Sequence, residues 1–190
     1  MGERDTQERL LVATVGLLSE ASRPEKITAR QIAKEAGANL AMINYFFKSK
    51  DELINLAIGQ IMQEETDKFI SVIKDDAEPK EQLFQVLSFF CETAIKYQRF
   101  LKLTIPYGLL TKEFKVESAY LEIIEEFYEN RIPTAYCRMI ALQIMSFTEL
   151  LLLRADAFKD YSGIDILNVR QRQQYLRFQI ELFLQPKNDD

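Results

Sequence analysis

Residues 27–53 constrain the fold of this chain more than any other stretch, because three helix boundaries follow one another there at short spacing. Thr28 begins a T-x-x-Q capping box, in which the hydroxyl accepts from a free backbone amide and the Gln side chain accepts in return from the amide of the capping residue. Gly37 follows where a helix end favours a left-handed residue. Asn39 can cap a second short helix, and Ser49 begins an S-x-x-E box that opens a third. Two short helices joined by a Gly-containing turn predict a helix-turn-helix, whose second helix can enter the major groove of DNA.

Helical spacing of apolar residues dominates the rest of the chain, and no stretch shows the sustained alternation typical of strands. With 190 residues, of which 47% are apolar, there is room for one large or two small domains with a real core. We therefore expect an all-α fold of about nine helices. Besides the pair within 28–47, the expected helices cover about 6–20, a long stretch from 50, a stretch from 80 that is interrupted at Pro106–Gly108, 117–130, 134–158 and 166–184.

Composition excludes several classes of site. The chain has no His, which removes the Ser-His-Asp and Cys-His nucleophile arrangements and the usual imidazole zinc sites. Cys91 and Cys137 are far apart and lack metal-ligand spacing, so we expect buried free thiols. No Gly-rich phosphate loop or metal-like carboxylate cluster stands out, and we predict neither an enzyme nor a bound cofactor or metal. No apolar run approaches ~18 residues, and the charged N-terminus is unlike a secretory signal, which favours a cytoplasmic protein.

The net charge is −5, but the excess acid is unevenly distributed along the chain. Residues 1–55 contain eight Lys/Arg and eight Asp/Glu, whereas 16 basic residues face 21 acidic ones beyond them. Contact with phosphate depends on a local strip of basic residues more than on net charge. The charge distribution is therefore compatible with DNA binding by the N-terminal region.

The second helix of the predicted motif supplies candidate DNA contacts. Its exposed face holds side chains that could reach a base edge or a phosphate. We expect that face to comprise Asn39, Leu40, Ala41, Met42, Asn44 and Tyr45. Lys50 lies in the first turn of the next helix, where the helix dipole disfavours a cation unless a phosphate binds, and Lys48 is close enough to assist. The alternative for all of these residues is an ordinary solvated surface.

The segments ITARQIAKEAG (27–37) and INYFFKSKDEL (43–53) resemble the DNA-binding signature of the tetracycline-repressor (TetR) family. Helix caps, turn Gly, aromatic cluster and S-K-x-x-L box fall in the family's order, over about a quarter of the chain. The resemblance implies an all-helical homodimer that binds a palindromic operator and releases it on binding a small ligand. It also implies a helix-turn-helix DNA-binding domain over 1–52 and a helical effector-binding and dimerisation domain over 53–190.

Matched by position, the family's DNA contacts fall on five places in this chain. The resemblance puts Thr28 and Arg30 near DNA, at the start of the first motif helix. It implies base reading by residues 39–42 and phosphate contact by residues 44–45. It also matches Lys50 to the family's helix-start Lys.

Two positions depart from the family pattern. Asn44 stands where many members have Tyr, although an I-N-Y form is a familiar variant. Phe46 stands where many have a His or Tyr that contacts phosphate, so that bond is not expected here. The departures predict weaker operator binding or different base contacts, and they leave the fold assignment unchanged.

Beyond the motif, no sequence signature identifies a ligand. A mostly apolar pocket is the natural place for an effector, and the scarcity of buried-looking cations argues against a strongly anionic one. Aromatic side chains at helical spacing are usually core, but six could line such a pocket: Phe90, Tyr97, Phe100, Tyr107, Phe127 and Phe147. Ligand binding near the Pro106–Gly108 break would tilt the long helix after Ser49. The tilt would change the separation between the recognition helices, the second motif helix of each subunit in the dimer.

The last two expected helices are too apolar for a solvent-facing pair. Two such helices per subunit would form a four-helix dimer interface. The candidate interface residues are Leu142, Met145, Glu149, Leu153, Val169, Leu176, Ile180 and Phe183. The alternative is that both helices pack only on their own domain.

We therefore predict a homodimeric, ligand-responsive transcriptional repressor. Its partners would be operator DNA, a second copy of the chain and an unidentified small, mostly apolar effector, with no membrane. One alternative is a helical protein-interaction module that has kept the motif and lost DNA binding; it would show neither salt-dependent DNA binding nor an effect of Lys50→Ala. The other is a small-molecule enzyme using a C-terminal pocket, which turnover of a bound compound would reveal.

Overall fold

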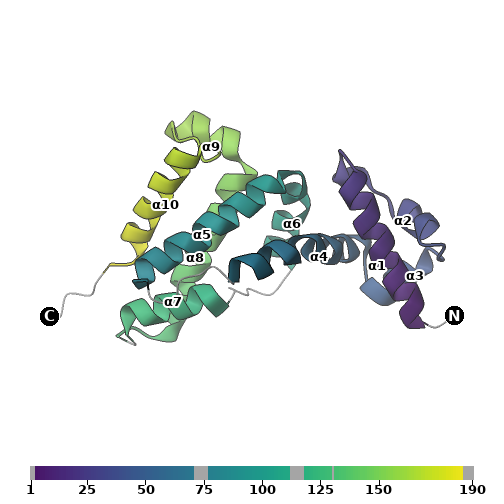
Figure 1. Ribbon diagram of the computed structural model, residues 1–190, viewed down its shortest axis with the longest axis horizontal. Coiled ribbons are helices and arrows are strands. Elements are labelled where there is room, and N and C mark those ends of the chain that lie inside the picture. The colour runs from purple at the N-terminus through teal and green to yellow at the C-terminus, as the bar shows by residue number, and fades with distance from the viewer. Residues whose placement is uncertain (1–2, 71–76, 112–117, 130, 186–190) are drawn as a thin grey trace. The chain divides into compact units, whose positions relative to one another are not determined.

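The computed structural model describes residues 3–70, 77–111, 118–129 and 131–185. Within these segments the chain forms ten α-helices, one 3-10 turn and no strand, which confirms the predicted all-α class (Figure 1). The chain divides into two compact units. The N-terminal unit comprises residues 1–68 and 97–110, and the C-terminal unit comprises 69–96 and 111–190. Packing thus assigns 53–68 and 97–110 to the same unit as the motif, while the domain boundary at residue 52 stays a prediction.

The N-terminal unit is built around α1, which packs against both α2 and α3 (Figure 1). Its elements are α1 (Glu3–Glu20), the 3-10 turn η1 (Pro24–Lys26), α2 (Ala29–Glu35), α3 (Ala41–Phe47), nearly all of α4 (Lys50–Ile70) and nearly all of α6 (Gln98–Thr111). Its core contains the fully buried side chains Leu10, Leu18, Ile32, Ile43, Leu53 and Phe100. Each such side chain contributes about 1.5–3 kcal/mol of apolar burial, which fixes the short helices that have little stability alone.

The C-terminal unit is a packed group of helices in which α5 contacts α7, α8 and α10 (Figure 1). Its elements are α5 (Pro79–Lys96), α7 (Ser118–Tyr128), α8 (Thr134–Leu153), α9 (Ala155–Ser162) and α10 (Val169–Phe183). The expectation of buried free thiols is confirmed, because Cys91 and Cys137 are both buried and unpaired. Burial raises the pKa of Cys91 to about 12, so its thiol is neutral and unreactive at physiological pH.

The helix boundaries differ from the expected ones in two places. The helix expected over 134–158 ends at Leu153, because Arg154 leaves helical geometry at φ −120° and ψ 37°, and α9 follows as a separate helix. Pro106 lies inside α6 and does not end it. The carbonyl that Pro106 leaves without an amide partner belongs to Lys102, which is exposed, so water can replace that bond. The expected helix ends at 117 and 130, and part of the break at 75–79, lie outside the described residues.

One described helix, α8, is long and apolar enough to cross a membrane by length and composition alone. A core helix of a folded domain passes the same test. Here α8 packs against α5, α7, α9 and α10, so its apolar composition is explained in part by packing within the C-terminal unit.

Candidate nucleic-acid interface

The start of α2 carries the predicted capping box. Thr28 is extended at φ −102° and ψ 152°, and its side chain accepts from the backbone amide of Gln31 at 3.3 Å. The Gln31 side chain accepts in return from the Thr28 amide at 2.8 Å. Two of the free amide donors at this helix start are therefore satisfied, and the side chains of Thr28 and Arg30 are exposed at the first turn.

The turn between α2 and α3 has the geometry that the Gly predicted. Gly37 has φ +57°, and its amide donates to the Lys34 carbonyl at 3.1 Å. The Ala38 amide donates to the Ala33 carbonyl at 2.9 Å. This pair of hydrogen bonds is a Schellman motif, which satisfies the last carbonyls of α2 and turns the chain into α3.

The start of α3 is capped one residue earlier than a standard N-cap. The Oδ1 atom of Asn39 accepts from the Ala41 amide at 2.9 Å, while Leu40 occupies the residue before the first helical turn. Asn39 and Ala41 are exposed, and Leu40 is 43% exposed. Three of the four residues matched to base reading, Asn39, Leu40 and Ala41, are therefore accessible to solvent.

The two faces of α3 separate as predicted, with one difference. Ile43 and Phe47 are buried in the core, whereas Asn44 is exposed and Tyr45 is 66% exposed. Met42, predicted on the exposed face, is half-buried and packs against the core of the N-terminal unit. The reason is helical geometry, since Met42 lies beside Ile43 at the edge of the inner face.

The end of α3 contains a strained residue that the sequence did not reveal. Lys48 has φ +62° and ψ −38°, and the Ser49 amide donates to the Phe47 carbonyl at 2.6 Å across it. These features form a γ-turn of the rare type with positive φ. Ser49 then accepts from the Glu52 amide at 3.0 Å and caps α4. The tight turn leaves the Lys48 side chain exposed between α3 and α4.

Lys50 is less free than the sequence indicated. Its ammonium group lies 3.4 Å from the Ile27 carbonyl and 3.4 Å from a carboxylate oxygen of Asp51. The side chain is 31% exposed. Lys50 therefore links the start of α4 to the residue before the Thr28 cap, and it stabilises the motif in addition to any contact with phosphate.

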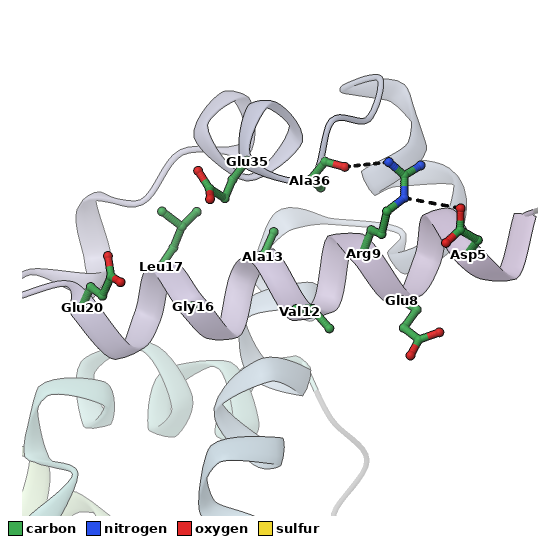
Figure 2. Close-up of a pocket in the computed structure, with 10 residues that line it drawn as sticks. All are labelled: Asp5, Glu8, Arg9, Val12, Ala13, Gly16, Leu17, Glu20, Glu35 and Ala36. Atoms are coloured by element: carbon green, nitrogen blue, oxygen red, sulfur yellow. Dashed lines mark hydrogen bonds and ion pairs between the residues drawn. The ribbon is translucent and has the colours of Figure 1, made fainter. Parts of the chain in front are cut away.

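Charge is distributed asymmetrically over the N-terminal unit. Residues 26–50 contain five Lys/Arg and one acidic residue, Glu35. A groove of about 660 Å³ along α1 is instead lined by four carboxylates and one guanidinium. In Figure 2, Ala13 and Leu17 lie on the side of α1 that faces α2, and Glu8 and Val12 lie on the opposite side of that helix. Arg9 binds Asp5 at 3.6 Å and the Ala36 carbonyl at 3.0 Å there. The acidic groove repels phosphate, so the α2–α3 side is the surface suited to DNA.

The six aromatic candidates for an effector pocket are divided between the two units. Tyr97, Phe100 and Tyr107 belong to the N-terminal unit, where Phe100 is 1% exposed and part of the core. Phe90, Phe127 and Phe147 belong to the C-terminal unit. The structure therefore does not gather the six in one unit, and none of them lines the groove on α1.

The candidate dimer residues also divide into two sets. Leu176 and Ile180 are 0% and 2% exposed within their own chain, so they belong to the core of the C-terminal unit and are not available to a second copy. Val169 is exposed, and the remaining five are half-buried: Leu142, Met145, Glu149, Leu153 and Phe183. Sequence periodicity identified the apolar helices but could not tell which of their faces packs inward.

Sequence reasoning missed a buried cation in the C-terminal unit. Arg172 of α10 is 4% exposed, and its Nη1 atom donates to the carbonyls of Ile166 and Leu167 at 3.1 and 3.2 Å. It stands among the polar residues of α10, which gave no signal that one of them is buried. The scarcity of buried-looking cations in the sequence argued against a strongly anionic effector. The buried Arg172 removes that argument.

Comparison with known proteins gives one partial sequence match. No protein-family model matches the chain. The HTH-type transcriptional regulator PksA of Bacillus subtilis (strain 168) is 36% identical over 63 residues, which are 33% of this chain and 31% of that protein. The match therefore spans about a third of the curated relative's length.

Solved structures match over nearly the whole chain. A transcriptional regulator from Rhodococcus sp. Rha1 has a TM-score of 0.57 at 18% identity, with 94% of this chain and 95% of that chain covered. A TetR-family transcriptional regulator from Streptomyces coelicolor has a TM-score of 0.52 at 16% identity, with 96% and 80% covered. At such low identity these likenesses establish a common fold.

Proposed function

Because the chain has the fold of the TetR-family transcriptional regulators, we propose that it is a DNA-binding repressor. It binds a palindromic operator as a homodimer and releases the operator when a small effector binds. It acts in the cytoplasm. The proteins that it resembles are transcriptional regulators and not enzymes.

One observation carries the proposal: the start of α3 is exposed after the Gly37 turn that joins it to the capped helix α2, and a turn with an exposed Lys48 follows the end of α3. Asn39, Ala41 and Asn44 are exposed on α3. Asn side chains can pair with the edge of an adenine, and a small Ala permits close approach to a base. Arg30 in the first turn of α2 and Lys48 after the end of α3 are also exposed and supply charge for backbone phosphates.

Fluorescence anisotropy on the DNA upstream of the gene, at two salt concentrations, tests DNA binding. Lys48→Ala should weaken binding on all sequences and reduce the salt slope by about 1. Asn44→Ala should cost about 1–3 kcal/mol if Asn44 reads a base, and it should relax preference at one base pair. Lys159→Ala is the matched control, because that ammonium lies in the C-terminal unit and is paired with Asp165 at 2.8 Å. Salt-independent binding, or equal loss in the control, would exclude the proposed interface.

Exposed apolar side chains on α8 and α10 support the homodimer. On α8 they recur at spacings that fall on one face of a helix, and on α10 they are one turn apart. These side chains, all at least 40% exposed, are Tyr136, Met139, Phe147 and Leu150 of α8 and Phe178 and Leu182 of α10. Exposed apolar side chains in this number on two helices are costly in water and typical of an interface.

Sedimentation tests the dimer directly. Phe178→Glu places a charge on the exposed apolar face and should shift the protein to a monomer and abolish high-affinity operator binding. Tyr161→Glu is the control, because Tyr161 is 91% exposed on α9 and outside that face. A wild-type protein that sediments as a monomer at micromolar concentration would refute the homodimer.

Effector release requires a ligand that binds one arrangement of the two DNA-reading units better than another. The helix α4 is suited to transmit the change, because it begins directly after the motif and ends at the first residues of the C-terminal unit. The Pro106–Gly108 segment is not a break in the chain's helices, so the effector site is not tied to it. Structures with and without the effector would show a changed separation of the recognition helices, and an unchanged separation would reject this mechanism.

A further inference from the structure

Two polar side chains are buried where α8 and α10 of the C-terminal unit contact each other. Thr148 of α8 is 0% exposed, and Gln179 of α10 is 3% exposed. The Thr148 hydroxyl lies 3.3 Å from the Oε1 atom of Gln179, and the Nε2 atom of Gln179 donates to the Ile144 carbonyl of α8 at 3.5 Å. Among the described residues, these are the hydrogen bonds that join α8 to α10, so Gln179 connects the two helices.

Each of these buried polar residues directly follows an exposed aromatic residue. Phe147 is 45% exposed and Phe178 is 66% exposed, and Leu182 is exposed one turn after Phe178. Successive residues of a helix point about 100° apart. Burial of Thr148 and Gln179 therefore goes together with an outward direction of the two phenyl rings.

Apolar burial alone does not fix the rotation of α10 finely. Leu176 and Ile180 are buried on one side of the helix, but the hydrophobic effect is non-directional, and a rotation that drew Phe178 inward would bury more apolar surface. Hydrogen bonds depend on direction, and Gln179 meets its partners on α8 in the observed orientation. The buried polar contact therefore opposes the rotation that would draw Phe178 into the core.

We infer that Thr148 and Gln179 are positioning residues for self-association. Their buried contact fixes the rotation of α10 against α8 and thereby keeps Phe147 and Phe178 available to a second copy of the chain. Setting the register of apolar helices is an attested use of buried polar groups. The inference rests on the proposed homodimer and names the residues that orient its apolar side chains. Neither residue has to touch the second copy, since both are buried within their own chain.

Gln179→Met tests the inference most directly. Met is flexible and close to Gln in length, and the Thr148 hydroxyl keeps its hydrogen bond to the Ile144 carbonyl at 2.7 Å, so the fold should be retained. Sedimentation over a range of protein concentrations gives the dimer dissociation constant. That constant should rise roughly tenfold or more, the effect of misplacing one apolar anchor of an interface. Gln173→Met, at an exposed position of the same helix, is the matched control and should leave the constant unchanged.

Two variants at Thr148 keep the inference testable if Gln179→Met does not fold. Thr148→Ser retains the hydroxyl and should dimerise like the wild type. Thr148→Val retains the shape of the side chain but removes the hydroxyl, so it should weaken the dimer. A role in packing alone predicts the opposite order, because Ser leaves a methyl-sized cavity and Val does not. That opposite order would contradict the inference.

Combining Gln179→Met with Phe178→Ala tests whether Gln179 acts through Phe178. If Gln179 holds Phe178 in place for the second copy, Phe178→Ala should cost less dimer affinity in the Gln179→Met background than in the wild type. In the Gln173→Met background it should cost as much as in the wild type. Equal costs in all three backgrounds would show that Gln179 does not orient Phe178.

The oligomeric state of the wild type separates this inference from the proposed function. A wild-type chain that stays monomeric refutes the homodimer and, with it, the role of the buried contact. A wild-type dimer whose dissociation constant is unchanged in both Gln179→Met and Thr148→Val leaves the homodimer in place and overturns the inference.

Discussion

Replacing Gly37 with Ala isolates the backbone geometry on which the helix-turn-helix depends. Gly37 has φ +57°, and a Cβ added there would meet only the Nη1 atom of Arg9, at 3.6 Å, which is ordinary van der Waals contact. The cost of the substitution is therefore conformational rather than steric. The left-handed region costs an L-residue about 1–2 kcal/mol. Ala also lowers the conformational entropy of the unfolded chain, which stabilises the folded state by about 0.4–1 kcal/mol. The net expectation is a loss of about 1 kcal/mol.

The same substitution at Gly16 is the matched control and should act with the opposite sign. Gly16 lies in the middle of α1, and nothing lies within 4 Å of a Cβ added there. Ala is preferred over Gly in a helix interior by about 0.5–1 kcal/mol. For a chain of this length, 1 kcal/mol corresponds to about 2–4 °C in melting temperature.

Thermal unfolding followed by circular dichroism, at one fixed protein concentration, measures both changes. The concentration is fixed because dimerisation would itself shift the melting temperature. Gly37→Ala should melt a few degrees below the wild type and Gly16→Ala slightly above it. A Gly37→Ala protein as stable as the wild type would refute the role of the left-handed turn, and so would equal losses in the two variants.

Three further substitutions test other features of the structure. Thr28→Ala removes the cap of α2 and should lower the free energy of unfolding by about 1 kcal/mol, measured by urea denaturation; Ser19→Ala, in the exposed last turn of α1, should be nearly neutral. Lys48→Gly relieves the positive φ of the γ-turn and should raise stability by about 0.5–1 kcal/mol while weakening DNA binding, whereas Lys48→Ala should weaken DNA binding without the gain. Burial raises the pKa of the Glu149 carboxyl, so the folded chain holds that proton more tightly than the unfolded chain does. The free energy of unfolding should therefore fall as the pH rises from the ordinary pKa through the folded one. Glu149→Gln should reduce this fall in denaturation measured across a pH series, and an unchanged pH slope would contradict the burial of that carboxylate.

Local sequence determined the motif because its helix boundaries are encoded within a few residues of each other. The T-x-x-Q box at Thr28, the left-handed Gly37 and the cap by Ser49 all appear in the structure as predicted. Hydrogen bonds between residues two to five positions apart depend little on the rest of the chain. The all-α class followed for the same reason, since helical periodicity is a local signal.

The longer-range features were decided by packing and could not be read from the order of residues. No local sequence preference favours a γ-turn with positive φ at Lys48. The turn forms because the buried faces of α3 and α4 fix both helices on either side of it. The apolar pattern around Leu176 fits a dimer interface as well as it fits a core, but the structure buries Leu176 within its own unit.

What the sequence by itself determined is therefore a helix-turn-helix and an all-helical chain. What only the tertiary structure decided is which side chains from distant parts of the chain meet. Lys80 and Glu81 of α5 pair with Glu181 and Arg177 of α10, about 100 residues away along the chain, and these pairs depend on the register of the two helices. No short-range pattern records such a contact, because the free energy that fixes it comes from apolar burial summed over the whole interface between the helices.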